Sequence, residues 1–122
     1  MEAMKLPRDT EDQKQLRGKK MQEASLYALQ VPLKTAESCF ALLNNQKAIA
    51  RYGNKNAVSD VGVGALLALS GLEGAILNVN INLPGIADEA VRSETYDKCR
   101  RFSAEGRKLH NEILDIVNLR IG

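Results

Sequence analysis

The segment from Val61 to Leu83 carries only one charged side chain, Glu73, and this feature limits the folds open to the chain more than any other. An apolar segment of this length is either a membrane-spanning helix or a helix buried inside a protein. Glu73 and three asparagines interrupt the apolar run, and their polar groups would lie in hydrocarbon if the segment crossed a bilayer. We therefore predict a central helix buried on most sides, and no membrane insertion.

Two lines of residues along this segment differ in size. Large side chains recur at steps of three and four residues, which is the spacing of one helix face. A neighbouring line at the same spacing holds only small or polar residues, namely Asp60, Gly64, Ala68, Gly71, Ala75, Asn78 and Asn82. Each glycine inside a helix costs about 1 kcal/mol relative to alanine. We therefore expect the small line to lie close to another backbone or to a ligand, which only a surface without large side chains permits.

The residues before this segment predict a second long helix, from about Thr10 to about Tyr52. Apolar residues between Leu26 and Leu43 recur at helical spacing, and Thr10 begins a capping-box pattern. Pro32 lies inside the helical pattern and removes one backbone donor. Two alternatives follow from it: one long helix that is kinked near Pro32, or two helices that are broken there.

The residues after the central segment predict a third helix, with Asp88 as its N-cap and an apolar stripe from Cys99 to Ile116. No stretch shows the period-two alternation of a β-strand. The predicted fold class is therefore all-α, an antiparallel bundle of three to four long helices, with residues 1–122 forming one domain. An almost entirely apolar central helix needs more than two neighbours, so we expect a homodimer, a higher homo-oligomer or a further segment of chain.

Residues 52–56 have the composition of a turn, because glycine and asparagine accept left-handed backbone angles at low cost. Ser59 is predicted to be the N-cap of the central helix, with Asp60 in its first turn. An acidic residue there interacts favourably with the helix dipole, which is a structural role that needs no ligand.

Charge and cysteine content exclude several classes of function. Seventeen Lys and Arg residues against fifteen Asp and Glu residues leave a net charge of +2, and aromatic residues make up 4% of the chain. A nucleic-acid-binding surface needs clustered basic residues with aromatic side chains, so none is predicted. Cys39, Cys99 and His110 show none of the paired spacings of a metal site, so no metal is predicted. Two cysteines at apolar positions and no signal peptide favour a cytoplasmic protein with reduced thiols.

Two stretches around the central helix carry a family resemblance. Residues Gly53 to Ala65 read Gly-Asn-Lys-Asn-Ala-Val-Ser-Asp-Val-Gly-Val-Gly-Ala, and residues Gly74 to Leu83 read Gly-Ala-Ile-Leu-Asn-Val-Asn-Ile-Asn-Leu. Together they resemble the signature of the formiminotransferase-cyclodeaminase family. The motifs Lys5-Leu6-Pro7 and Val31-Pro32-Leu33, with Arg17, stand where that family has similar residues. The resemblance covers nearly the whole chain.

The resemblance implies an all-α domain that dimerises and binds a tetrahydrofolate, often polyglutamylated, as substrate, with no permanently bound cofactor. Family members either close 5-formimino-tetrahydrofolate to 5,10-methenyl-tetrahydrofolate with loss of ammonia, or interconvert the methenyl and 10-formyl forms. The first reaction needs an acid for the leaving ammonia and a base for the attacking nitrogen. We expect an ammonia lyase of the cyclodeaminase type, with methenyltetrahydrofolate cyclohydrolase as the first alternative and a non-catalytic helical oligomerisation module as the second.

The chain departs from the family pattern at its start. Family domains begin with about two further helices, including a Gly-Ser-rich segment, and an aspartate thought to be catalytic lies shortly before the position of Met1. We therefore expect residues 1–122 to need an N-terminal segment, a formiminotransferase domain or another partner for activity. A natural truncation, one half of a split gene and a trimmed product all fit this pattern.

The candidate site residues fall mainly in the family motif. Within that motif we predict Asp60 as the catalytic carboxylate, and Asn54 and Ser59 as its neighbours in the ligand pocket. Lys5 and Lys55 are predicted to meet the carboxylates of a glutamate tail, although solvated surface charge is the commoner role of a lysine.

Two further candidates, Asn78 and Asn82, lie one turn apart on nearly the same helix face. They either bind the ligand or hold a neighbouring loop, since buried amides need partners. Asp60 and Asn78 are eighteen residues apart, about 27 Å at a rise of 1.5 Å per residue. They cannot hold the same reacting carbon in one subunit. Either they contact opposite ends of an extended folate, or one of them contributes to the site of a second copy.

Overall fold

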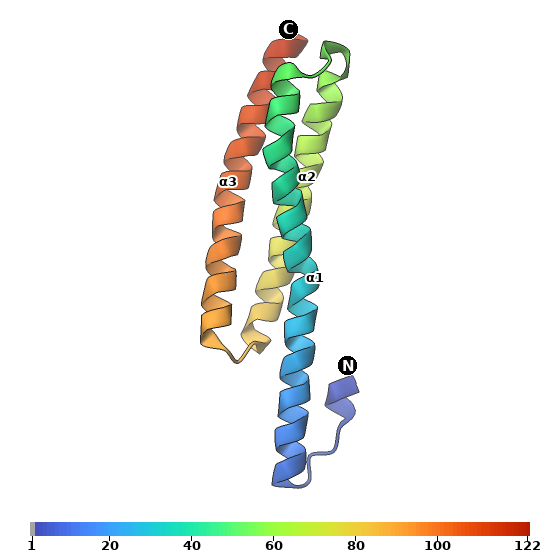
Figure 1. The fold of residues 1–122 in the computed structure, drawn as a ribbon, viewed down its shortest axis with the longest axis vertical. Helices are drawn as coiled ribbons and strands as arrows, with labels where there is room; N and C mark the ends of the chain where they lie inside the picture. The colour runs from blue at the N-terminus through green and yellow to red at the C-terminus, as the bar shows by residue number, and fades with distance from the viewer. Residues whose placement is uncertain (1) are drawn as a thin grey trace.

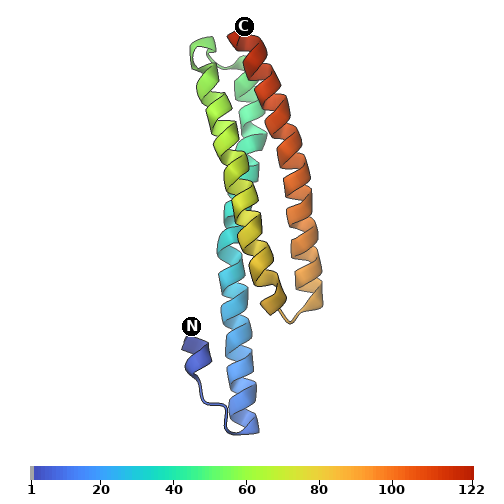
Figure 2. The same cartoon turned by 180° about the vertical axis from the view of Figure 1, so that it is seen from behind.

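The computed structural model describes residues 2–122, and its fold consists of three long helices joined by short turns. The long helices are α1 Glu11–Tyr52, α2 Val58–Asn82 and α3 Glu89–Ile121. The single turns of 3-10 helix are η1 Glu2–Lys5, η2 Lys55–Ala57 and η3 Leu83–Gly85. Successive long helices run in opposite directions and lie side by side (Figure 1, and from behind Figure 2). The described residues contain no strand, so the predicted all-α antiparallel bundle is confirmed, with three long helices.

Helix α1 begins where the sequence predicts. Thr10 Oγ1 accepts a hydrogen bond from the Gln13 backbone N–H at 3.1 Å, and Gln13 Oε1 accepts one from the Thr10 backbone N–H at 3.0 Å. This reciprocal capping box satisfies donors that the first helical turn leaves free. The helix then continues through Pro32 for a total of 42 residues. Of the two alternatives for Pro32, the structure therefore has the single helix.

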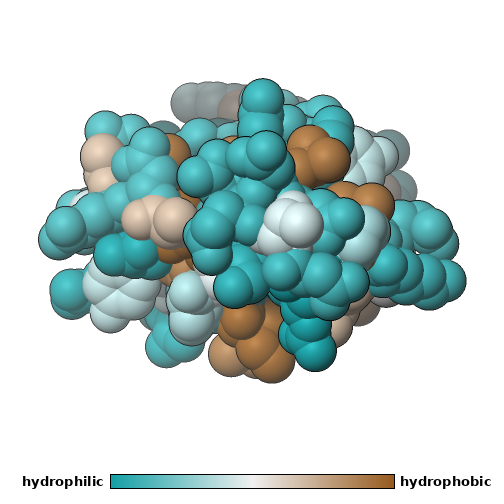
Figure 3. All heavy atoms as spheres, turned by 90° about the horizontal axis from the view of Figure 1, so that it is seen from below, coloured by the Kyte–Doolittle hydropathy of each residue, from teal (hydrophilic) through white to brown (hydrophobic). Residues whose placement is uncertain are grey.

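The first turns of α1 reach beyond the turn between α2 and α3, with only η1 alongside (Figure 1). Leu26, predicted to belong to the buried stripe, is therefore 38% exposed, whereas Leu29 is buried. Gln22 links α1 to the turn between α2 and α3. Its side chain donates to the Gly85 carbonyl at 3.1 Å and accepts from the Ala87 N–H at 2.9 Å. Viewed from this end, the molecule is mainly hydrophilic with separate apolar patches (Figure 3).

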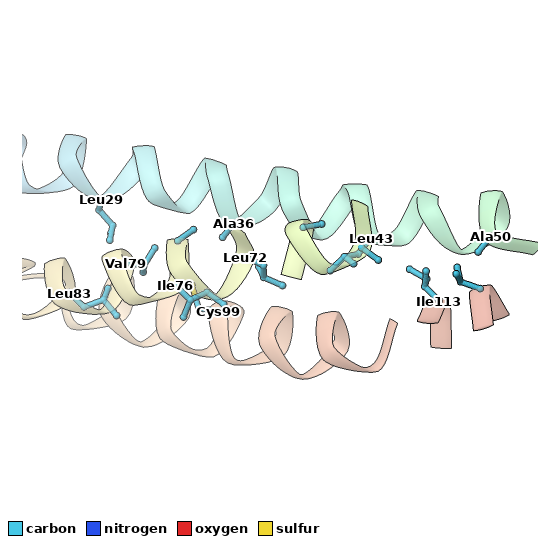
Figure 4. Close-up of a cluster of buried hydrophobic side chains, with 14 of the residues drawn as sticks. Leu29, Ala36, Leu43, Ala50, Leu72, Ile76, Val79, Leu83, Cys99 and Ile113 are labelled. Atoms are coloured by element: carbon cyan, nitrogen blue, oxygen red, sulfur yellow. The ribbon is translucent and has the colours of Figure 1, made fainter. Parts of the chain in front are cut away.

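The core lies along the line where the three helices meet (Figure 4). Its largest fully buried side chains are Leu43, Leu72, Ile86, Ile113, Val79 and Cys99. The Phe40 and Phe102 rings stack with their centroids 4.7 Å apart and join α1 to α3. Asp88 caps α3, as predicted, by accepting hydrogen bonds from the backbone N–H groups of Ala90 and Val91. The apolar stripes read from the sequence therefore face the common core, with Leu26 as the exception.

The start of α2 differs from the prediction. The helix begins at Val58 and its N-cap position is Ala57, so Ser59 lies inside the first turn and is not the cap. The reason is that Asn54 Oδ1 accepts from the Asn56 N–H at 2.9 Å and starts the 3-10 turn η2, which leads directly into α2. Gly53 has φ −72°, so the expected left-handed angle is also wrong there. Glycine is needed because a Cβ would lie 2.5 Å from the Ile49 carbonyl oxygen.

The small line of α2 faces α1. A Cβ at Gly71 would lie 2.8 Å from Cys39 Sγ, and one at Gly64 would collide with the side chain of Gln46. Both neighbours belong to α1 of the same chain. The predicted close approach is therefore present, and the groups that approach are side chains of α1.

A further side of α2, which faces neither α1 nor the core, is largely uncovered by the described residues. We call it the outer face, and its members are Val63, Leu66, Leu67, Ser70, Gly74, Leu77 and Ile81, all exposed. By length and composition, residues 55–85 would suffice to cross a bilayer, but core helices pass the same test, and 33% of the tested window is buried here. Glu73 in mid-helix is bonded to Arg107 of α3. We interpret α2 as a core helix with one uncovered side.

Candidate functional site

A groove between α1 and α2 brings two of the predicted site residues together. It has a volume of about 390 Å³, and its walls are Ala28, Val31, Pro32 and Thr35 from α1 and Ala75, Asn78 and Asn82 from α2. Thr35 Oγ1 donates to the Val31 carbonyl at 3.2 Å, and Asn82 Nδ2 donates to the Asn78 carbonyl at 2.7 Å. Asn78 is exposed and Asn82 is half-buried. The two amides therefore form one polar wall, opposite the part of α1 that contains Pro32.

The predicted residues of the family motif lie elsewhere, at the corner between α1 and α2. Asn54, Lys55, Ser59 and Asp60 are all exposed there. The side chain of Asn54 is used as a cap, whereas the carboxylate of Asp60 has no hydrogen bond or ion pair with any other described residue. The corner is an open surface that carries one carboxylate and one ammonium group, and it would need a further wall to enclose a ligand.

Arg120 of α3 holds this corner in place, although no sequence pattern predicts this role. Its guanidinium donates to the Ala50 carbonyl at 2.8 Å and to the Gly53 carbonyl at 2.6 Å. These two carbonyls lie at the C-terminal end of α1, where backbone acceptors have no helical partner and a cation is favoured. Arg120 stands near the chain end in an ordinary amphipathic pattern, so only the antiparallel packing of α3 shows this role.

Lys5 belongs to neither group. It belongs to η1, beside the projecting start of α1, while the α1–α2 corner is at the opposite end of the molecule (Figure 1). Its ammonium group is 3.4 Å from Glu2 Oε1 in an exposed pair. Lys5 and Lys55 therefore cannot bind the same glutamate tail in one chain. The seven predicted residues occupy three separate places along the bundle.

Three larger hollows contain no predicted site residue, and the smallest of them, about 500 Å³, is lined by Asp115, Asn118 and Leu119 of α3. One, about 560 Å³, lies between the ends of α2 and α3 and includes Arg92, whose guanidinium already donates to the carbonyls of Ile86 and Ala87. Another, about 550 Å³, lies between the η1 segment and the start of α1, and includes Leu6 and Tyr27. Volume alone therefore does not identify the site, and the α1–α2 groove is the hollow with free amide groups from predicted residues.

Among titratable groups, Glu73 has the best-defined surroundings. Its Oε1 accepts from Arg107 Nε at 2.9 Å and from Ser103 Oγ at 2.7 Å. The hydrogen bond from Arg107 is the main cause that lowers the pKa of this carboxyl below its ordinary value of 4.5, and burial opposes it. Burial raises the pKa of the Cys99 thiol, which favours the unreactive protonated form.

Neither His110 nor a metal-binding group of side chains contributes to the site among the described residues. The His110 ring contacts Asn111 Oδ1 at 3.0 Å through Nδ1, and its Nε2 is buried without a partner in the described part of the chain. Among residues 2–122, no three His, Cys, Asp or Glu side chains are grouped so that they could hold a metal ion. The predicted absence of a metal stays a prediction.

The fold and the groove define the chain as an all-α helical-bundle protein with a polar ligand-sized groove. Residues 1–101 match the model of the family described as formiminotransferase-cyclodeaminase. The chain therefore belongs to the formiminotransferase-cyclodeaminase family, whose members work in folate one-carbon chemistry, and the resemblance read from its motifs is confirmed.

Curated relatives of two kinds match the chain over almost its whole length. A methenyltetrahydrofolate cyclohydrolase of Methylorubrum extorquens is 35% identical over 121 residues, which cover 99% of this chain and 58% of the relative. Formimidoyltransferase-cyclodeaminases of Gallus gallus and Sus scrofa are 34% and 32% identical over 120 residues, covering 98% of this chain and 22% of each relative. The chain thus spans little more than half of one relative and about a fifth of the others.

Proposed function

We propose that this chain is the helical part of a tetrahydrofolate one-carbon enzyme of the formiminotetrahydrofolate cyclodeaminase type. The observation that carries the proposal is the family match over residues 1–101, together with relatives that are named for reactions of this chemistry. Methenyltetrahydrofolate cyclohydrolase is the second candidate, favoured by the Methylorubrum extorquens relative at 35% identity. The substrate in both cases is a tetrahydrofolate derivative, often polyglutamylated.

The chemistry of ring closure sets what the site must supply. The N10 nitrogen of 5-formimino-tetrahydrofolate attacks the formimino carbon, a tetrahedral carbon forms, and the former imine nitrogen, once protonated, leaves as ammonia. One group must take the N10 proton and another must protonate the leaving nitrogen. Asp60 is the carboxylate that the family motif offers for one of these roles, and it is exposed and unpaired with any other described side chain.

Asp60 does not complete such a site alone. We propose that the second proton-transfer group and the missing wall of the corner come from residues beyond this chain, either ahead of Met1 or in a second copy. The length of the relatives supports this, because the aligned part is 58% of the cyclohydrolase and 22% of the chicken cyclodeaminase. Asn54, Ser59 and Lys55 would line the same site.

Turnover of two substrates tests this proposal. The 122-residue chain should bind a reduced folate but convert 5-formimino-tetrahydrofolate barely faster than solution does, as judged from methenyl-tetrahydrofolate absorbance. Completing the chain with the unaligned residues of the Methylorubrum extorquens relative should raise the rate by about 10² to 10⁴-fold, the usual effect of positioned acid-base catalysis. Loss of absorbance when methenyl-tetrahydrofolate is supplied instead would select the cyclohydrolase.

Substitution of Asp60 separates its catalytic role from a structural one. In the completed protein, Asp60→Asn should lower turnover or folate binding, since it removes the charge and keeps the shape. Asp115→Asn is the matched control, because Asp115 is also an exposed aspartate of the bundle and lies on α3. Full activity from residues 1–122 alone would place the whole acid-base machinery in this chain. Neither binding nor turnover in either form would favour the non-catalytic assembly module.

We further propose that the outer face of α2 is the interface of a homodimer. Five large apolar side chains on this face are between 49% and 78% exposed, and Ser70 and Gly74 lie between them. A Cβ at Gly74 would meet no atom within 4 Å in this chain, so its flat surface allows another helix to approach closely. Two copies related by a two-fold axis would cover this face on both at once.

Sedimentation velocity tests the dimer. The protein should sediment as a dimer, and Leu77→Glu should convert it to a monomer because the charge would be buried in the interface. Leu119→Glu is the matched control, since Leu119 is 82% exposed on α3 and lies away from the outer face. A protein that stays monomeric at high concentration would instead assign the outer face to the additional chain length of the relatives.

A further inference from the structure

Pro32 has no structural explanation in this fold. Proline is the least favourable residue in a helix interior, because it lacks the N–H that bonds to the carbonyl four residues earlier. It usually marks a place where a helix ends or turns, yet α1 continues for twenty residues beyond it. Pro32 is also not in the core, since it is only half-buried and lines the groove between α1 and α2. A function in the groove would explain why a proline stands there.

The missing N–H of Pro32 leaves one backbone acceptor free. The carbonyl of Ala28 would have received that hydrogen bond, and Ala28 lines the same groove as Pro32. The carbonyl of Val31 differs, because it accepts from Thr35 Oγ1 at 3.2 Å. Ala28, on the α1 wall of the groove, therefore has a carbonyl oxygen that has lost its helical partner.

The opposite wall adds acceptors from α2. Asn82 uses its Nδ2 to donate to the Asn78 carbonyl at 2.7 Å, which leaves its Oδ1 free to accept. The amide of Asn78 has no hydrogen bond to any other described residue, so both of its groups are free. Ala75, which also lines the groove, is small and buried.

The lining residues are all uncharged, and this selects the part of a ligand that fits. The glutamate end of a folate carries carboxylates and would find no cation in the groove. The reduced pterin end is neutral and has a planar pyrimidine ring, with an amino group and ring N–H groups along its edges, which match free carbonyl oxygens. The volume of about 390 Å³ lies within the usual range for small-molecule sites.

We propose that the α1–α2 groove binds the reduced pterin ring of the folate, and that Pro32 is a positioning residue that keeps the Ala28 carbonyl free to accept from it. Asn78 and Asn82 hold the other edge of the ring. This proposal rests on the proposed folate function and adds to it the place where the pterin ring binds. Asp60 lies eighteen residues away along α2, about 27 Å at 1.5 Å per residue, so a proton transfer at N5 or N10 of a ring bound here would come from Asp60 of a second copy and not from Asp60 of the same chain.

Isothermal titration calorimetry with three compounds tests the proposal. The compounds are 5-formyl-tetrahydrofolate, a tetrahydropterin that lacks the glutamate end, and p-aminobenzoylglutamate, which lacks the ring. Pro32→Ala restores the N–H, so the Ala28 carbonyl becomes occupied inside the helix. We expect about 10-fold weaker binding of the first two compounds, equivalent to one lost hydrogen bond. Binding of p-aminobenzoylglutamate should not change.

Gly18→Ala is the matched control. Gly18 lies in the same helix, away from the groove, with open space where a Cβ would stand. Both substitutions favour the helix and should raise the melting temperature, but only Pro32→Ala adds a donor in the groove. Asn78→Ala should weaken ring binding as Pro32→Ala does, and circular dichroism checks that each variant is folded.

The outcomes separate this proposal from the function on which it rests. If no folate compound binds the unsubstituted chain, both are overturned. If 5-formyl-tetrahydrofolate binds but Pro32→Ala and Asn78→Ala leave its affinity unchanged, the folate function stands and the ring subsite is wrong. If p-aminobenzoylglutamate loses as much affinity as the tetrahydropterin, the groove holds the other end of the folate and the proposal also fails.

Discussion

Two sides of α2 contain glycines, but the surroundings of these glycines differ. On the side toward α1, Gly64 and Gly71 lie against side chains of Gln46 and Cys39, so their missing Cβ atoms are required by packing. On the outer face, Gly74 lies between exposed leucines and has open space around it. A glycine in an apolar helix allows another group to pack closely against the helix. In α2 the chain itself provides that group at Gly64 and Gly71, but not at Gly74.

The largest expected effect compares two leucines on these sides. Leu72 is fully buried between the three helices, whereas Leu77 is 71% exposed on the outer face. Leu72→Ala should lower the free energy of unfolding by about 2 to 5 kcal/mol, the usual cost of a large core deletion. Leu77→Ala should change that of the monomer by no more than about 0.5 kcal/mol. Urea unfolding measures both.

The dependence on protein concentration should also differ between the Leu77 and Leu72 variants. If the outer face forms a dimer interface, the cost of Leu77→Ala should grow with protein concentration, because association stabilises the folded state. The cost of Leu72→Ala should not. Equal losses for the two variants in dilute protein would mean that the outer face is covered within one chain.

Much of this fold could be predicted from sequence because local signals and packing agree. The N-caps Thr10 and Asp88 satisfy backbone donors through their own side chains, so sequence spacing alone identifies them. The start of α2 could not be predicted in the same way. Asn54 caps a preceding 3-10 turn, and this moves the helix start ahead of Ser59.

The site was less predictable than the fold, since it depends on which turns of different helices face each other. The spacing of Asn78 and Asn82 places them on one face, and the structure brings them into one groove. The opposite wall at Ala28 and Pro32 depends on the register between α1 and α2, which no local pattern encodes. The roles of Asp60, Lys5 and the other motif residues stay predictions.

Substitutions of glycines on the two sides of α2 should have an intermediate effect on the free energy of unfolding. Gly71→Leu should lower the free energy of unfolding by about 1 to 3 kcal/mol, because the side chain would displace Cys39 from its place against α2. Gly74→Ala should raise it by about 1 kcal/mol, the difference in helix propensity at an open position. Thermal unfolding in dilute protein measures both, and a stable Gly71→Leu variant would show that α1 does not approach α2 this closely.

The smallest expected effect concerns Glu73, which stands where the α3-facing side of α2 meets the outer face and is bonded to Arg107 and Ser103. Because the pKa of this carboxyl is lowered in the fold, mainly by the Arg107 hydrogen bond, the ionised form binds its partners better than the protonated form. Its contribution to stability is therefore present above the unfolded value of about 4.5 and is lost as pH falls through the lower folded pKa.

Glu73→Gln keeps the shape and removes the charge, so the gap in unfolding free energy between the two proteins should shrink as the pH is lowered below 4.5. The same gap measured in an Arg107→Gln background should depend much less on pH, and a gap that is constant with pH in both backgrounds would show that Glu73 contributes only by its shape.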